Sequence, residues 1–210
     1  MAGKRRRGGL AYLIKLSFNG NNGVVTSVVD DYGNSFVQNV VADKPSRLNN
    51  ALVFTGNTEW LTCNSAYVAG IANSSVSSFG VDLRFKLSNL GVNHTIVSWG
   101  NTANNNPAML IGVSNANKIR IQRRDNTLLT KTYDVTSPLL VANTEYVLTT
   151  YFSGGNVSIW LDGIFISNAV DYVTTTSNNL PFNIFSVGAR VQSTATLPLI
   201  GTVSEVRVYE

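Results

Sequence analysis

The sequence predicts an all-β protein built as a two-sheet antiparallel β-sandwich of the jelly-roll, concanavalin A-like type. Short apolar or alternating runs recur about every ten residues between clusters of Asn, Gly and Ser, which is the pattern of strands joined by turns. Only 13% of the 210 residues are charged, and Ala, Glu and Lys are too scarce to favour helices. The length of the chain is typical of one domain. Its short strands are too many for one open sheet, so we expect two packed sheets.

The expected strands follow these runs in chain order. They are residues 11–18, 24–29, 35–40, 51–54, 59–62, 79–87, 94–99, 108–113, 118–123, 128–133, 145–152, 156–161, 164–170, 183–189 and 201–209. Two connections between expected strands contain residues that favour a tight turn. Gly154-Gly155 lies in the first, and Asp162-Gly163 supplies the positive φ of a type I′ turn in the second. These turns predict a three-stranded meander near the C-terminus.

Positive charge is concentrated at the N-terminus. Lys4, Arg5, Arg6 and Arg7 supply four of the sixteen basic residues, which leaves twelve basic against twelve acidic groups in the rest of the chain. Nucleic-acid binding by a neutral domain is therefore not expected. We divide the chain into a basic arm, residues 1–10, and a sandwich domain, residues 11–210. We predict that the arm is an assembly contact with another protein, and the alternative is a solvated tail without a partner.

Several segments occur in an order known from one superfamily. They are the opening strand with its Phe18-Asn19-Gly20 turn, the turn Asp30-Asp31-Tyr32-Gly33-Asn34, the hairpin at 50–61, the strands at 79–87 and 95–100, the meander at 145–163, and the closing run Gly201-Thr202-Val203-Ser204-Glu205-Val206-Arg207-Val208-Tyr209. From about residue 11 onward, these segments resemble the LamG-like jelly-roll domain of the concanavalin A-like lectin/glucanase superfamily, of the kind found in phage structural proteins. The resemblance implies a jelly-roll sandwich, but functions in that superfamily range from lectins and glycosidases to adhesins and phage structural proteins.

The acidic residues argue against a glycosidase. Such an enzyme needs two carboxyl groups at one cleft, and the Glu-x-Asp-x-Glu type motif of the superfamily's catalytic branch is missing from this chain. Asp82 and Glu205 each lie alone, with Arg84 and Arg207 two residues away, so we expect ion pairs there. His94 is the sole histidine and is expected to be solvated. We therefore predict no catalytic residues and no resident cofactor.

Glycan binding would use aromatic faces stacked on sugar rings, with Asn and Asp side chains reaching the hydroxyl groups. The candidate residues are Trp60, Trp99, Trp160, Asn104, Asn105 and Asn106, and Tyr151 and Tyr172 are further aromatic candidates. The alternative for any of these tryptophans is core packing, since alternation along a strand turns about half of its side chains inward.

Two further groups of polar residues have both a functional and a structural interpretation. Asp30, Asp31 and Asn34 offer oxygen ligands for calcium in one tight turn, although turn capping by Asx side chains explains the same residues. Residues Lys118, Arg120, Gln122 and Arg124 alternate with other residues and are expected on the solvent-facing surface of a sheet.

These features predict a non-catalytic virion structural protein of a bacteriophage: a capsid decoration, fibre or tail component that is anchored partly by the arm and adheres to host or environmental glycans. Its expected partners are other virion proteins, with polysaccharide and a second copy of the chain left open. Lys15 interrupts the apolar run that follows the arm, and no small-residue cleavage site follows, so we expect synthesis in the host cytoplasm and a place on the virion surface. No membrane association is expected, because no run is long enough to span a bilayer. The alternative functions are a free glycan-binding lectin-like module and, third, a glycoside hydrolase.

Overall fold

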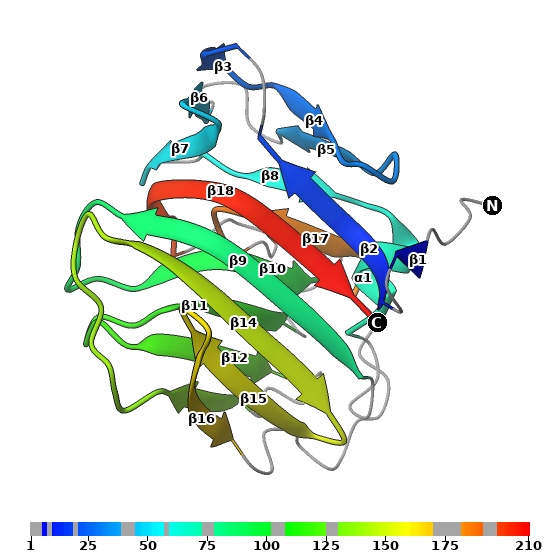
Figure 1. Ribbon diagram of the computed structural model, residues 1–210. Helices are drawn as coiled ribbons and strands as arrows, with labels where there is room; N and C mark the ends of the chain where they lie inside the picture. The colour runs from blue at the N-terminus through cyan, green and yellow to red at the C-terminus, as the bar shows by residue number, and fades with distance from the viewer. Residues whose placement is uncertain are drawn as a thin grey trace.

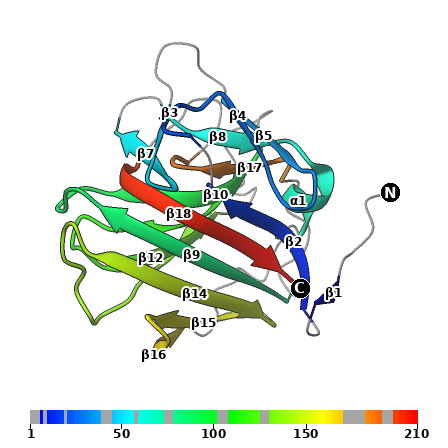
Figure 2. The ribbon, with the colours of Figure 1, turned by 45° about the horizontal axis from the view of Figure 1, so that its top comes forward.

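Two antiparallel sheets pack face to face in the computed structural model of the protein, which confirms the predicted β-sandwich (Figure 1). The structure describes residues 6–7, 10–18, 21–38, 45–56, 59–72, 78–101, 108–124, 130–169, 182–190 and 197–210. The sheets form two layers: β9, β14 and β18 lie in the sheet nearer the viewer and β10 and β17 in the sheet behind it (Figure 2).

The first sheet has ten strands. They are β1 (Arg6–Arg7), β2 (Leu10–Ser17), β3 (Gly23–Val24), β6 (Ser46–Leu48), β7 (Ala51–Thr55), β9 (Phe79–Leu87), β14 (Glu145–Ser153), β15 (Asn156–Leu161), β16 (Ile164–Ala169) and β18 (Ile200–Tyr209). Their order is β16-β15-β14-β9-β18-β7-β6-β3, with β2 on β18 and β1 on β2. The C-terminal strand β18 is therefore central, and it joins segments that are far apart in the sequence.

The second sheet has eight strands. They are β4 (Ser27–Val29), β5 (Ser35–Gln38), β8 (Leu61–Cys63), β10 (His94–Gly100), β11 (Ala108–Val113), β12 (Ile119–Arg124), β13 (Thr130–Asp134) and β17 (Ile184–Val187). Their order is β13-β12-β11-β10-β17-β8-β5-β4. One short helix, α1 (Ala66–Gly70), packs near β17 and β2.

Alternation along the strands divides the core from the two outer faces. In β14, Tyr146, Leu148 and Phe152 are buried, whereas Thr149 and Tyr151 lie between them on the outer face. In β12 the buried isoleucines alternate with half-buried polar residues, so Arg120, Gln122 and Arg124 lie on the outer face as predicted. Each sheet thus presents a polar or aromatic outer surface above a shared apolar core.

The predicted meander is confirmed. Gly154 and Gly155 have φ of 56° and 85°, and Asp162 and Gly163 have φ of 51° and 79°, as the tight turns of hairpins require. These turns connect β14 to β15 and β15 to β16, and both pairs are antiparallel.

Other boundaries differ from the prediction. The run expected at 24–29 divides into β3 and β4, which belong to different sheets. Strands β1 and β6 and helix α1 were not predicted, because elements of two to five residues are too short to show a period in the sequence.

Candidate functional site

An aromatic pocket lies on the outer face of the ten-stranded sheet. It has a volume of about 400 Å³ and is lined by Thr149, Tyr151, Trp160, Gly163 and Tyr209. Thr149 and Tyr151 come from β14, Trp160 from β15, Gly163 from the β15–β16 turn, and Tyr209 from the end of β18. Strands β14, β9 and β18 run side by side under it (Figure 1). We call these five residues the aromatic pocket.

Gly80 forms part of the base beneath Tyr209. In β9, Gly80 is paired with Tyr151 on one side and with Tyr209 on the other. A Cβ atom at Gly80 would lie 2.3 Å from two ring carbons of Tyr209, so the ring packs directly over the glycine. The missing side chain is what allows an aromatic ring to lie across the sheet at this position.

A carboxylate adjoins the pocket. Asp82 Oδ1 accepts hydrogen bonds from Thr149 Oγ1 at 2.9 Å and from the Tyr209 hydroxyl at 3.3 Å. Among the described residues, no side chain or backbone group donates to Asp82 Oδ2. The Phe165 ring, which is 56% exposed, meets the Trp160 ring nearly edge-on, with 5.6 Å between their centroids. The pocket therefore combines braced aromatic surfaces with an adjoining oxygen acceptor, which is the combination that sugar recognition uses.

The three candidate tryptophans occupy different environments. Trp99 is 0% exposed and packs between the sheets, with its Nε1 donating to Val68 O at 3.3 Å. Trp60 is 7% exposed and packs against Ile184 and Ala189. A ring with both faces covered cannot stack on a sugar, which corrects the prediction for Trp99 and argues against it for Trp60. Trp160 alone of the three lies in the pocket.

The other predicted site residues are distributed as follows. Asn104, Asn105, Asn106 and Tyr172 lie outside the described residues, as do Lys4 and Arg5 of the arm, whereas Tyr151 lines the pocket. Arg6 and Arg7 form β1, which pairs with Leu10 and Ala11 at the start of β2.

The prediction did not include Tyr209 in the pocket. Period-two alternation from Arg207 could have placed Tyr209 on the outer face, but not beside Trp160.

One of the two predicted ion pairs is present as expected. Glu205 pairs with Arg207. Asp82 does not pair with Arg84, which instead donates to Glu145 Oε1 at 3.0 Å across the β9–β14 pair. The partners on the neighbouring strands account for the difference: Glu145 lies diagonal to Arg84 across the β9–β14 pair, and Asp82 Oδ1 accepts hydrogen bonds from Thr149 and Tyr209.

The predicted calcium turn is closed by its own hydrogen bonds. The buried Asp30 carboxylate accepts from the backbone N–H of Tyr32 at 3.0 Å and of Asn34 at 2.7 Å, and from Asn34 Nδ2 at 2.9 Å. Asp31 pairs with Lys15 at 2.7 Å. The described residues include no group of three or more His, Cys, Asp and Glu side chains arranged for a metal ion. A calcium ion would need these oxygens turned to a common centre, whereas here they accept hydrogen bonds from within the protein. Calcium at this turn stays a prediction.

His94 is buried rather than solvated, which corrects the expectation for this residue. It is 2% exposed, and its Nδ1 accepts from the backbone N–H of Ile200 at 3.4 Å. Removal from water lowers the pKa of the imidazole, an effect only partly opposed by hydrogen bonding with the backbone of Asn89 and Pro198. His94 therefore contributes to the structure as a neutral side chain between β10 and β18.

Comparison with known proteins supports the fold. No family model matches the chain, and no curated protein matches it. Among solved structures, the CBM40 domain of Ruminococcus gnavus IT-sialidase bound to α2,6-sialyllactose matches with a TM-score of 0.54 at 14% identity, over 68% of this chain and 80% of its own. Domain 4 of a GH43 extracellular arabinanase from Geobacillus stearothermophilus, in complex with arabinotriose, matches with a TM-score of 0.57 at 16% identity, over 96% and 93%.

A third match comes from a larger protein. Trypanosoma rangeli sialidase gives a TM-score of 0.66 at 14% identity, over 97% of this chain but only 31% of its own length. At these identities the matches establish the architecture alone, so the chain is a two-sheet antiparallel β-sandwich of the jelly-roll type. In the described part of the chain, no helix has the length and apolar character that crossing a membrane requires.

Proposed function

We propose that the protein is a non-catalytic glycan-binding module and that it holds a sugar in the aromatic pocket. The observation that carries this proposal is the grouping of Tyr151, Trp160 and Tyr209 around one concavity, with the Asp82 carboxylate adjoining it. Two solved structures with the same architecture were determined with saccharides, sialyllactose in one and arabinotriose in the other.

The pocket would recognise a sugar through two kinds of contact. The C–H face of a pyranose or furanose ring packs against aromatic side chains, and a hydroxyl group donates to Asp82 Oδ2. The aromatic residues on β14, β15 and β18 are fixed by strand pairing, and Trp160 is braced by Phe165. Few side chains would have to become ordered when a sugar binds, so the entropic cost of binding is small. A small contact area can then give measurable affinity.

The acidic residues near this face support binding without hydrolysis. A glycosidase uses two carboxyl groups on either side of the scissile bond. Here Asp82 accepts hydrogen bonds from Thr149 and Tyr209, and Glu205 on the same sheet is paired with Arg207. A substrate would have to displace these contacts before either group could act on it.

Replacing Trp160 by Ala is expected to weaken glycan binding at least about tenfold, because the largest stacking surface of the pocket is lost. The measurement is a glycan array with the wild-type chain, followed by calorimetric titration of the best ligand. Ile164→Ala is the matched control, since Ile164 is an exposed apolar residue in the same hairpin but does not line the pocket. A wild-type chain that binds no glycan on the array, or equal losses in both variants, would contradict the proposal.

Gly80→Ala tests the same site without removing any pocket side chain. The added methyl group meets the Tyr209 ring, and the far end of that side chain can rotate away. We therefore expect weaker glycan binding with a free energy of unfolding close to that of the wild type. Unchanged affinity in both Gly80→Ala and Trp160→Ala would place sugar binding elsewhere on the molecule.

We further propose, as the sequence predicts, that the sandwich is displayed on a phage particle through its basic arm. In support, Arg6 and Arg7 of the arm form β1, which pairs with the start of β2, and β2 pairs with β18 up to Tyr209, so these two arginines lie near the C-terminus (Figure 1). Deleting residues 1–9 is expected to reduce incorporation into particles, measured by immunoblotting of purified virions. Wild-type levels of incorporation would rule out anchoring by the arm.

A further inference from the structure

Outward-facing side chains form a row across the ten-stranded sheet at the level of the aromatic pocket. Strand pairing places Phe165 on β16 opposite Trp160 on β15. It also places Trp160 opposite Thr149 on β14, and Thr149 opposite Asp82 on β9. The row therefore runs at right angles to four neighbouring strands (Figure 1). Neighbouring strands lie about 4.8 Å apart, so the row is about 14 Å long from β16 to β9, which is longer than a single sugar ring.

Exposed aromatic surface extends from the aromatic pocket toward β16. Phe165 does not line the pocket, but its ring is 56% exposed and meets the Trp160 ring at 67° between the two planes. Tyr151, which lines the pocket from β14, is 39% exposed. A single exposed ring is ordinary on a protein surface, whereas adjacent exposed rings are typical of a ligand-binding surface. The three rings together offer stacking surface for more than one sugar ring.

The charges along the row leave one carboxylate without a cation. Beyond Asp82 the row continues with Arg207 on β18 and Lys15 on β2. Arg207 pairs with Glu205, and Lys15 pairs with Asp31 at 2.7 Å. Among the described residues, Asp82 forms no ion pair, and its two hydrogen bonds both reach Oδ1. An acidic group brought to this carboxylate would be repelled, whereas a neutral hydroxyl group can donate to Oδ2.

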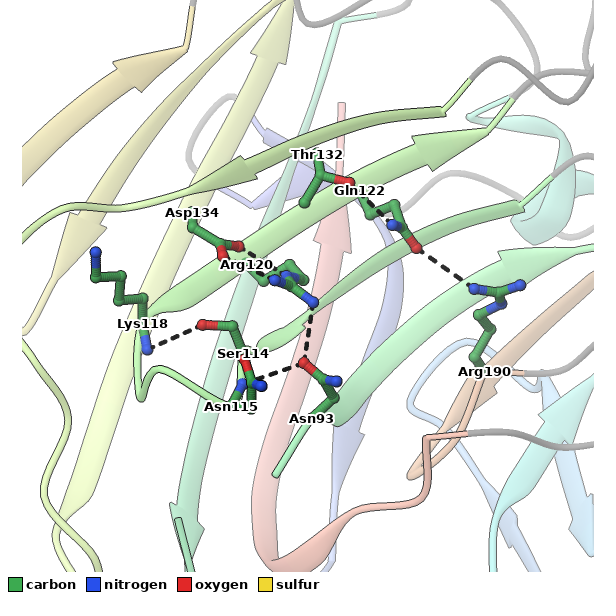
Figure 3. Close-up of polar contacts among 9 residues, drawn as sticks. All are labelled: Asn93, Ser114, Asn115, Lys118, Arg120, Gln122, Thr132, Asp134 and Arg190. Atoms are coloured by element: carbon green, nitrogen blue, oxygen red, sulfur yellow. Dashed lines mark hydrogen bonds and ion pairs between the residues drawn. The ribbon is translucent and has the colours of Figure 1, made fainter. Parts of the chain in front are cut away.

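The polar side chains on the outer face of the eight-stranded sheet bond to one another instead. Arg120 Nε and Nη2 donate to the two carboxylate oxygens of Asp134 at 2.7 and 2.8 Å (Figure 3). Gln122 Nε2 donates to Thr132 Oγ1 at 2.9 Å, and Gln122 Oε1 accepts from Arg190 Nη1 at 3.4 Å (Figure 3). A ligand would have to displace these contacts, so the row on the ten-stranded sheet is the more accessible surface for a sugar chain.

We propose that the ligand is a neutral linear oligosaccharide of two or more units that lies across the strands along this row. The inference rests on the proposed function, because it takes the aromatic pocket as the position of one sugar ring. A hydroxyl group of that ring donates to Asp82 Oδ2, and the next ring packs on the exposed face of Phe165. The length of the row thus selects a chain over a monosaccharide, and the charge of Asp82 selects a neutral chain over an acidic one.

The first experiment titrates the full chain with cello-, malto- and manno-oligosaccharides of one to four units and follows binding by calorimetry and NMR. In at least one series we expect the dissociation constant to fall about tenfold from the monosaccharide to the trisaccharide, because a second ring gains a stacking contact. A monosaccharide that binds as tightly as the trisaccharide overturns the inference and leaves the proposed function intact. Binding to none of the three series while the glycan array is positive also overturns the inference alone, whereas a negative array contradicts the proposed function as well.

The second experiment compares the best trisaccharide with the same trisaccharide after oxidation of its primary hydroxyl groups to carboxylates. The wild-type chain is expected to bind the oxidised form at least about tenfold more weakly. Asp82→Asn is expected to reduce this difference, because the side-chain carbonyl still accepts from Thr149 and Tyr209 while the charge is removed. Equal affinity of the wild-type chain for the two forms, or an equal difference in both proteins, would overturn the preference assigned to Asp82.

Phe165→Ala tests the position of the second ring. We expect the affinity for the trisaccharide to fall about tenfold and the affinity for the monosaccharide to change little, because only the longer ligand reaches β16. Ile164→Ala is the matched control, since Ile164 is exposed on the same strand but pairs with the buried Leu161 and lies outside the row. Equal losses for the two sugars in Phe165→Ala would mean that Phe165 only braces Trp160, and an equal loss in Ile164→Ala would mean a general surface effect. Either result overturns the inference.

Discussion

Replacing Trp99 by Ala is expected to lower the free energy of unfolding by about 3–5 kcal/mol. Trp99 is fully buried, and its ring makes edge-on contacts with Phe79 at 5.9 Å and Phe185 at 4.7 Å between centroids. Phe79 belongs to the ten-stranded sheet and Phe185 to the eight-stranded sheet, and the indole N–H donates to Val68 in α1. One side chain thus connects both sheets and the helix, and its removal leaves a cavity at their junction.

Urea-induced unfolding followed by circular dichroism measures this loss. Trp160→Ala serves as the comparison, because Trp160 is only partly buried on the outer face and its loss leaves no internal cavity. We expect Trp99→Ala to reduce stability while the folded fraction keeps its ligand binding, and Trp160→Ala to do the opposite. A loss below about 1 kcal/mol in Trp99→Ala would contradict the packing described here.

Gly112→Ala is expected to lower the free energy of unfolding by about 3 kcal/mol, a loss second only to that of Trp99→Ala among these variants. A Cβ atom there would lie 2.0 Å from the carbonyl oxygen of His94 and 3.1 Å from the Cα of Thr95. Both atoms belong to the backbone of the neighbouring strand β10, where the pairing with β11 shifts register between Thr95 and Val97. The backbone cannot rotate out of the way, so the strand pair must separate.

Gly80→Ala is the matched comparison, since the chemical change is identical and the position is also inside a strand. There the methyl group meets the ring of Tyr209, a side chain that can move. Urea unfolding of the two variants should therefore show a large loss for Gly112→Ala and a small one for Gly80→Ala. Equal losses would mean that the clash at Gly112 is relieved by a small backbone shift.

The sequence by itself determined most of the strands and the meander. Alternation and tight turns are local properties: Asp162-Gly163 defines its turn with two consecutive residues, and the alternation in β12 places Arg120, Gln122 and Arg124 on one face wherever the strand lies. The Glu205–Arg207 ion pair could also be predicted from the sequence, because its two residues are two positions apart on one strand.

The tertiary structure alone decided which of the tryptophans faces outward and what surrounds it. Trp99 lies in β10, where every residue is buried, so alternation does not distinguish its two faces. The Asp82–Tyr209 hydrogen bond joins residues 127 positions apart, and the Arg190–Gln122 hydrogen bond likewise depends on the strand order. Strand order follows from how the two sheets bury their apolar faces against each other, a collective property that no local pattern contains. For that reason the sequence predicted a sandwich, and only the folded chain brought Tyr151, Trp160 and Tyr209 together around one pocket.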